Sequence, residues 1–243
     1  MFRDTEKICW DFRKKIDVGI ILEQSWMFSE VIKQFKGGRL FYWFLVDRYA
    51  YLVEKNGKKY LLLSSNGASI IACRVEEMVR LGAEKVFRVG TCGSLQKDVE
   101  VGDIVLSFAA IKDEGTSLQY VPLEFPSVTD PYPLLAFLEK LKEKKLNVHL
   151  GITWSTDGRF VESNKKILLF SKLGVKNVDM ETSAFLTVCW VKRISGISLG
   201  IVTDKPIEDL KEEFKGSIKN LSSVKKMVCK ILPAIISTIF ESD

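Results

Sequence analysis

Short apolar runs alternate with helical apolar repeats along most of this chain. Runs rich in β-branched and aromatic residues predict strands, whereas apolar residues spaced three and four positions apart predict amphipathic helices. The predicted strands span 18–22, 41–46, 49–53, 60–63, 85–89, 104–111, 148–154, 175–180 and 197–203. The predicted helices span 28–35, 66–82, 131–145, 163–173, 182–192 and 217–240, and 1–15 is expected to be a short helix or an arm.

Strands alternate with helices through the last two thirds of the chain. This order is typical of an α/β fold, and it predicts a mixed, mostly parallel central sheet flanked by helices. Asn56-Gly57 between two strands predicts a hairpin, and Asp130 before Pro131 predicts a helix N-cap. No linker or internal repeat divides the sequence, so residues 1–243 are expected to form a single domain.

The composition mainly excludes classes of protein. With 47% hydrophobic and 28% charged residues among 243, the chain can bury a large core. The net charge of +5 comes from interspersed lysines and acids, so a nucleic-acid partner is not expected. Five scattered cysteines and a single histidine, His149, offer no pattern for a disulfide framework, a metal site or a Ser–His–Asp triad. No signal peptide or apolar run of about 18 residues is visible, so we expect a cytoplasmic protein with no membrane partner.

One stretch combines a cation with small residues. An apolar run at 86–89 contains Arg88 and leads into Gly90-Thr91-Cys92-Gly93-Ser94, which is predicted to be a turn. The backbone can approach an oxyanion closely where Cβ is missing. Hydroxyl and N–H groups can donate there, and a guanidinium binds phosphate in a bidentate way. We therefore expect a site for phosphate or a similar anion, and the alternative is a strand, a tight turn and one surface arginine.

Acidic residues follow the ends of three later predicted strands. They are Asp157, Asp179 with Glu181, and Asp204. Ligands of open α/β sheets bind at the carboxyl ends of the strands, so these acids are expected near Arg88. Such a set suits transfer of a glycosyl group to phosphate. One carboxylate would accept two vicinal ribose hydroxyls, and a second carboxyl, with a pKa raised in a partly dry pocket, would protonate the leaving base.

Three motifs, in order along the chain, resemble the nucleoside phosphorylase family that includes hexameric purine nucleoside phosphorylases and uridine phosphorylases. The stretch from Arg88 to Leu95, RVGTCGSL, is similar to the family's phosphate-binding strand and turn. The stretch from Val178 to Thr182, VDMET, is similar to its ribose-binding element. The stretch from Asp113 to Ser117, DEGTS, is similar to a segment of uridine phosphorylases.

The resemblance implies phosphate as a co-substrate, no metal or organic cofactor, and self-association into dimers that build a hexamer. It also implies roles for individual residues, with Arg48 expected to reach a neighbouring subunit's site. The implied residues are Arg88, Gly90, Thr91 and Arg48 for phosphate; Glu181, Met180 and Thr91 for ribose; Asp204 as the acid to the base; and Arg159, Phe160 and Asp179 for the base.

The sequence departs from the family pattern at several places, two of which concern the expected phosphate and base sites. After its first strand the family usually has a second phosphate loop with glycine and arginine, whereas this chain has Leu22-Glu23-Gln24-Ser25. Glu23 is expected to repel phosphate there. The family also usually has two adjacent aromatic residues near the base, and here Arg159 replaces the first while Phe160 keeps the second.

Four functions follow from these observations. The leading one is phosphorolysis of a nucleoside by a pentosyltransferase, giving free base and ribose 1-phosphate. A purine is favoured because Asp204 can protonate N7, while the segment 113–130 favours uridine phosphorylase. A nucleosidase, in which water replaces phosphate, is the nearest chemical alternative. A non-catalytic nucleoside-binding relative is the fourth.

Overall fold

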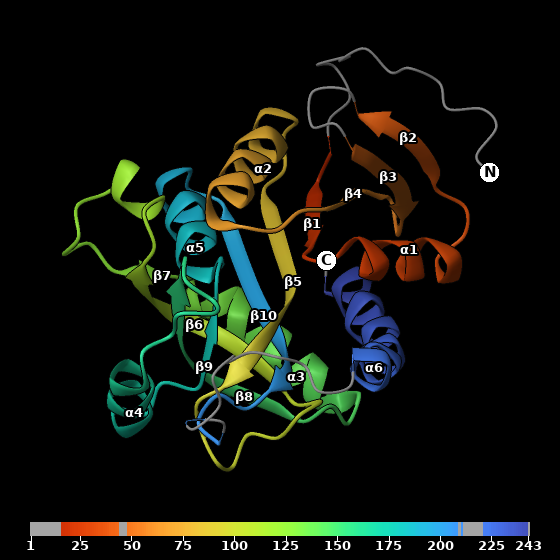
Figure 1. Ribbon diagram of the computed structural model, residues 1–243. Coiled ribbons are helices and arrows are strands. Elements are labelled where there is room, and N and C mark those ends of the chain that lie inside the picture. Colours follow the sequence, from red (N-terminus) through yellow and green to blue (C-terminus); the bar gives the residue numbers. More distant parts are fainter. Residues whose placement is uncertain (1–15, 44–47, 209, 211–220, 243) are drawn as a thin grey trace.

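The described strands all join one mixed sheet, which is the scaffold of the molecule (Figure 1). The computed structural model describes residues 16–43, 48–208, 210 and 221–242, so the arm expected at 1–15 lies outside the described residues. The strands are β1 (Val18–Leu22), β2 (Arg39–Trp43), β3 (Arg48–Lys55), β4 (Lys58–Ser64), β5 (Lys85–Ser94), β6 (Ile104–Asp113), β7 (Ser127–Val128), β8 (Val148–Thr156), β9 (Asn177–Asp179) and β10 (Ser195–Asp204). The helices are α1 (Ser25–Gln34), α2 (Ala68–Arg80), α3 (Pro131–Glu143), α4 (Asn164–Lys172), α5 (Thr182–Val191) and α6 (Leu221–Glu241), with a 3-10 turn at Ser117–Gln119.

Part of the sheet closes on itself. β5 pairs with β10, β10 with β6, β6 with β8, β8 with β9, and β9 again with β5. Strands β1, β4, β3 and β2 extend the sheet outward from β5. The pairings of β1 with β4 and β5, of β5 with β10, and of β8 with β6 and β9 are parallel, and the others are antiparallel. The predicted α/β fold with a mixed sheet is thus confirmed.

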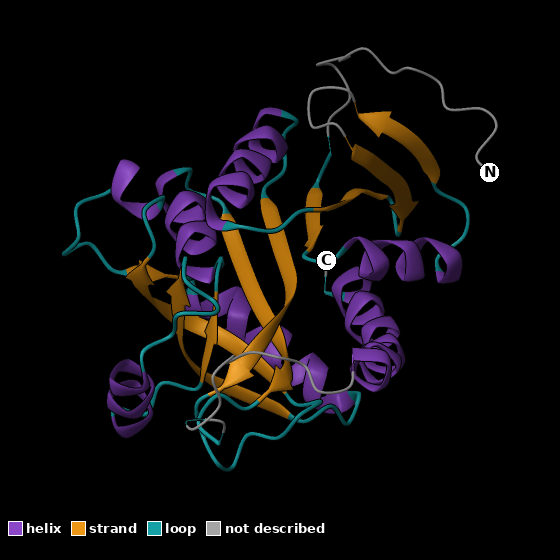
Figure 2. Ribbon diagram, viewed as in Figure 1, coloured by secondary structure: helices purple, strands orange, loops and turns teal. Residues whose placement is uncertain are grey.

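Helices cover both faces of the sheet, which explains why its central strands are apolar on both sides (Figure 2). Successive side chains of a strand point to opposite faces. In β1, Ile20 packs with the residues of α1, α3 and α6, whereas Ile21 packs with those of α2 and α5. In β5, Phe87 packs with the residues of α1, α3 and α6, and the preceding Val86 packs with those of α2 and α5. No helix in the described ranges is long and apolar enough to cross a membrane.

The turn predicted at 90–94 is wrong, because β5 continues through these residues. Its pairing with β10 runs from Lys85 to Gly93. Gly90 and Gly93 are not among the glycines with positive φ, so they do not reverse the chain. They make room instead, since a Cβ at Gly93 would lie 2.7 Å from Cγ of Pro206. Glycine here allows close packing within a strand. The sequence pattern alone does not distinguish such a glycine from one in a turn.

Two local predictions are confirmed. β3 and β4 pair antiparallel around Asn56 and Gly57, whose φ angles of 51° and 75° are those of a type I′ turn. Asp130 precedes α3, and its Oδ1 accepts a hydrogen bond of 3.1 Å from the backbone N–H of Tyr132. Proline at the first position of α3 fits this start because its missing N–H has no helical partner there.

Candidate active site

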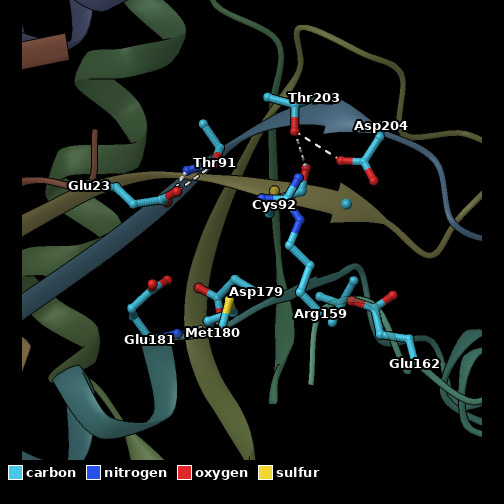
Figure 3. Close-up of a pocket in the computed structure, with 12 residues that line it drawn as sticks. Glu23, Thr91, Cys92, Arg159, Glu162, Asp179, Met180, Glu181, Thr203 and Asp204 are labelled. Carbon is cyan, nitrogen blue, oxygen red and sulfur yellow. Dashed lines mark hydrogen bonds between the residues drawn. The ribbon is translucent and has the colours of Figure 1, made fainter. Parts of the chain in front are cut away.

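A cavity lies where several strand ends meet (Figure 3). Glu23 follows β1, Thr91 belongs to β5, Glu181 lies between β9 and α5, Asp204 ends β10, and Arg159 comes from the loop between β8 and α4. The empty volume, counted out to the open mouth, is about 440 Å³. The strand-end rule therefore located the cavity correctly.

Arg88 lies behind the cavity wall and is fully buried, with 0% of its surface exposed. Its Nη2 is 2.5 Å from Oε2 of Glu181 and 3.3 Å from Oε2 of Glu23. Its Nη1 is 3.0 Å from Oδ2 of Asp179. Burial disfavours the charged guanidinium, but the three acids outweigh this and raise the pKa of Arg88 above its usual value. The alternative of a surface arginine is excluded.

Glu23 occupies the donors that the sequence assigned to an anion. Its Oε2 accepts a hydrogen bond of 2.5 Å from the backbone N–H of Thr91, and its Oε1 accepts one of 2.8 Å from the Thr91 hydroxyl (Figure 3). Gly90 permits this approach, because a Cβ there would lie 2.4 Å from Oε2 of Glu23. Glu23 was expected to repel an anion at this site. The structure shows its own carboxylate bound there.

Glu181 faces both the cavity and Arg88. Its Oε1 accepts a hydrogen bond of 2.8 Å from the backbone N–H of Gly67, and Oε2 contacts Arg88. Burial raises the pKa of Glu181 from its ordinary 4.5 to about 7, with Arg88 opposing the rise and Glu23 and Asp179 adding to it. The cluster holds one guanidinium among three carboxyl groups, so a proton on Glu181 near neutral pH relieves its excess negative charge.

Asp179 fixes the start of α5. Its Oδ1 accepts a hydrogen bond of 2.6 Å from the Ser155 hydroxyl, and its Oδ2 accepts one of 2.6 Å from the Thr182 hydroxyl. The backbone N–H groups of Glu181 and Thr182 also lie 3.3 Å from Oδ1. These contacts satisfy N–H groups at the helix N-terminus and orient Glu181. Asp179 lines the cavity, but its engaged oxygens indicate a positioning role, and the predicted contact with a base stays a prediction.

Asp204 enters the cavity through an irregularity of β10. The pairing of β10 with β5 shifts register between Val202 and Asp204, as in a β-bulge, which redirects a side chain. Asp204 Oδ1 accepts a hydrogen bond of 2.9 Å from the Thr203 hydroxyl. Asp204 lies across the cavity from Glu181 in Figure 3, so an acid and the proposed sugar-binding carboxylate face the same space.

The loop after β8 presents different residues than the sequence predicted. Arg159 lines the cavity as expected, but Phe160 does not line it and is 63% exposed. The backbone of Val161 bonds to the carbonyl of Gly158 at 3.0 Å, so a tight turn points Arg159 inward and leaves Phe160 outside, with the guanidinium 5.7 Å from the ring centre. Glu162, which no motif singled out, is buried and lines the cavity instead.

Of three further predicted residues, Met180 lines the cavity as expected, Asp157 lies elsewhere, and the side chain of Arg48 is not described. Met180 lines the cavity and also a second one, which includes Gly67 and Tyr120. Asp157 accepts a hydrogen bond of 3.0 Å from the N–H of Gly115. It lines the second cavity but not the first. Arg48 is the first residue of β3, and its side chain lies outside the described part of the chain.

No group of three or more His, Cys, Asp or Glu side chains is placed to hold a metal ion within the described ranges. The sole histidine, His149, lies in β8 with its Nε2 2.9 Å from Asp103, away from the cavity. Sequence reasoning missed Glu23 as a ligand and Glu162 as a lining residue. The position of Glu23 directly after β1 was the available signal, since other strand ends had already been taken as site positions.

Comparison with known proteins identifies relatives over most of the chain. Residues 30–237 match the family model described as the phosphorylase superfamily. The uridine phosphorylase of Escherichia coli strain K12 is 30% identical over 173 residues, which cover 65% of this chain and 68% of that protein. The guanosine phosphorylase of Halorubrum lacusprofundi is 34% identical over 136 residues, which cover 56% of this chain and 55% of that protein.

A solved structure has the same fold. The purine nucleoside phosphorylase of Toxoplasma gondii, crystallised with immucillin-H, superposes with a TM-score of 0.79. The match covers 96% of this chain and 94% of that chain, at 22% sequence identity. At that identity the likeness concerns the fold.

Proposed function

We propose, because this chain belongs to the phosphorylase superfamily, that its cavity cleaves the N-glycosidic bond of a nucleoside by phosphorolysis. The products are the free base and ribose 1-phosphate, so the enzyme is a pentosyltransferase. One observation carries the proposal: Thr91, Glu181 and Asp204 line a single cavity, with Arg88 in contact with Glu181 behind it. These residues come from distant parts of the chain, and their meeting supports the roles assigned from the motifs.

In the proposed reaction an oxygen of phosphate attacks C1′ of the ribose as the bond from C1′ to the base nitrogen breaks. The buried carboxylate of Glu181 accepts hydrogen bonds from the 2′- and 3′-hydroxyls, and Met180 packs against the sugar. Asp204 gives its proton to the leaving base, so the base departs neutral. The oxocarbenium-like transition state is stabilised by the negative charge of the bound phosphate and of the nearby carboxylates.

The base is proposed to be a purine, with uridine as the second candidate. The position of Asp204 at the cavity supports a purine, because a carboxyl group there can protonate a ring nitrogen. The name of the Escherichia coli relative supports uridine. Arg159 and Glu162 line the side of the cavity away from Glu23, so they are the groups we propose to contact the base. Charged side chains there would recognise it by hydrogen bonds rather than by stacking.

Hydrolysis of the same bond is a second candidate function, and one observation favours it. The carboxylate of Glu23 already holds the N–H and hydroxyl of Thr91, two of the groups expected to bind phosphate. In that case water would take the place of phosphate as the nucleophile, and the products would be the base and free ribose.

Turnover assays test these functions directly. The full-length protein is incubated with inosine, adenosine, guanosine and uridine, each with and without inorganic phosphate, and the released base is measured. Phosphorolysis predicts base release that requires phosphate, together with ribose 1-phosphate. Release at the same rate without phosphate would establish the hydrolytic function instead. No turnover of any nucleoside would contradict both and would leave a nucleoside-binding protein.

We also propose self-association into dimers and a hexamer, with phosphate and the nucleoside as the small-molecule partners. The predicted role of Arg48 requires it, because that residue was assigned to a neighbouring subunit's site. Analytical ultracentrifugation of the full chain measures the assembly, and a monomer at micromolar concentration would contradict the assignment of Arg48.

A further inference from the structure

The side chain of Glu23 is held in the anion site by donors of two β5 residues, Thr91 and Arg88. The Thr91 N–H and hydroxyl bind its two oxygens at 2.5 and 2.8 Å, and Nη2 of Arg88 lies 3.3 Å from Oε2. Its backbone N–H donates to the Val89 carbonyl at 3.0 Å, which fixes the residue beside β5. Only 7% of Glu23 is exposed. These contacts reproduce, with one carboxylate, the way a bound oxyanion would use the same groups.

The shape of β5 is fitted to this carboxylate. A Cβ at Gly90 would lie 2.4 Å from Oε2 of Glu23 and 2.6 Å from Nη2 of Arg88. Because glycine has no Cβ, these two side chains can meet there. The amide of Gln24 also donates to Oε1 of Glu23 at 2.8 Å. The carboxylate is therefore seated on four donor groups and against a bare stretch of backbone.

Charge prevents phosphate from binding beside an ionised Glu23. Arg88 is the cation of the cluster, and Glu23, Asp179 and Glu181 already lie within 3.3 Å of its guanidinium. A phosphate added next to them would bring further negative charge into a site with little solvent to screen it. The Thr91 N–H and hydroxyl cannot serve both ligands at once. Phosphate and the carboxylate therefore exclude each other.

We propose that Glu23 is a resident carboxylate ligand of the anion site, and that inorganic phosphate binds only after this side chain has left. The inference rests on the proposed phosphorolytic function and adds a residue that sets the affinity for the nucleophile. Glu23 lines the cavity, so rotation about its side-chain bonds is enough to release Thr91. Gln24 precedes α1 without a side-chain cap bond, so its amide can follow or release Glu23 without loss of a helix cap.

The test measures binding of inorganic phosphate by isothermal titration calorimetry to the full-length protein and three variants. Glu23→Ala removes the resident ligand, and Glu23→Gln keeps its shape without its charge. Glu30→Gln, on the exposed side of α1, removes the same charge away from the site and is the matched control. We expect the Kd for phosphate to fall at least about tenfold in both Glu23 variants and to stay within about twofold in Glu30→Gln. Phosphate binding that is unchanged or weaker in a folded Glu23 variant overturns the proposal.

A kinetic measurement separates this inference from the proposed function. If phosphorolysis occurs, the KM for phosphate falls in Glu23→Ala by the same factor as the Kd. Tighter phosphate binding without turnover of any nucleoside would uphold the resident ligand and refute the phosphorylase function. Phosphate-dependent turnover with a phosphate KM that is unchanged in Glu23→Ala would uphold the phosphorylase function and refute the resident ligand. Base release without phosphate that is lost in Glu23→Ala would overturn both, because Glu23 would then act on water.

Discussion

Replacing Arg88 by methionine removes the single guanidinium that is shared by Glu23, Asp179 and Glu181. Methionine roughly fills the volume, so the main loss is electrostatic. Removing one partner of a buried ion pair costs about 3–5 kcal/mol, because the other charge stays buried without compensation. We expect a loss of that size in the free energy of unfolding at pH 8, where the carboxyl groups are ionised in the unfolded chain.

The loss in free energy of unfolding caused by Arg88→Met is expected to become smaller as the pH falls. Without Arg88 the pKa of Glu181 rises further, because Arg88 is the cation that opposes its rise, and a raised pKa gives stability that is present at low pH and lost as the pH rises. Each carboxyl group that binds a proton on folding stabilises the variant by about 3 kcal/mol more at pH 5.5 than at pH 8, since one pH unit corresponds to about 1.4 kcal/mol. In the wild-type protein Glu181, with a pKa of about 7, already supplies about 2 kcal/mol of this gain, so the destabilisation is expected to shrink by about 1 kcal/mol at pH 5.5.

Urea unfolding followed by far-UV circular dichroism at both pH values measures these losses. Lys142→Met is the matched control, because Lys142 contacts a single acid, Glu139, and the two side chains are 52% and 67% exposed. Pairs near the surface contribute about 0–1 kcal/mol, so this variant is expected to change little and without the same pH dependence. Equal losses for the two variants, or a loss for Arg88→Met that is the same at both pH values, would refute the electrostatic account of the cluster.

Three other predictions concern single residues at the cavity or directly behind it. Asp204→Asn is expected to lower kcat for a purine nucleoside about 10²–10⁴-fold while nucleoside binding persists, and unchanged purine turnover would show that another group supplies the proton. Glu181→Gln is expected to remove the pH dependence that comes from the raised pKa of Glu181 (about 7): the wild-type protein loses stability as the pH rises from about 5 to 8, and in thermal unfolding the variant should lose less. A wild-type protein that instead becomes more stable over this range would contradict the raised pKa. Gly90→Ala is expected to cost about 1–3 kcal/mol in urea unfolding, because the tips of Glu23 and Arg88 must move apart, and an unchanged stability would show that both tips relocate freely.

The strand pattern predicted where the cavity lies, because strand ends meet at one edge whatever their side chains do. Arg88, Glu181 and Asp204 were each assigned from such an end, and the structure places them around one site. The turn at 90–94 was wrong for a physical reason. Glycine tolerates both a reversed chain and a crowded strand, and only the position of Pro206 and Glu23 decides between them.

Two aspects of the site could not be predicted from the pattern. The loop after β8 has no periodicity, so the hydrophobic pattern did not indicate its turn at Gly158, which keeps the predicted Arg159 at the cavity but places Glu162 there instead of Phe160. The negative charge of Glu23 led to the prediction that it repels a dissolved anion. The sequence pattern did not indicate that the Glu23 carboxylate, held next to β5 because Glu23 follows β1, would itself accept the hydrogen bonds of Thr91.

The pairing of β5 with β10 also determines when the site can form during synthesis. Arg88 stands opposite Ser198, and Gly93 stands opposite Asp204, so β5 acquires this neighbour only after more than 100 further residues have been added. Until then a growing chain can pair β5 with β1 along Lys85–Val89 and with β9 at Gly93 and Ser94, and the side of Arg88 that faces Ser198 of β10 stays uncovered. A ribosome-bound chain that stops before residue 195 therefore contains most of the residues of the cavity but not the enclosure that buries its charges. Enclosure of the cluster therefore requires β10, although its acids, Glu23, Asp179 and Glu181, all precede that strand.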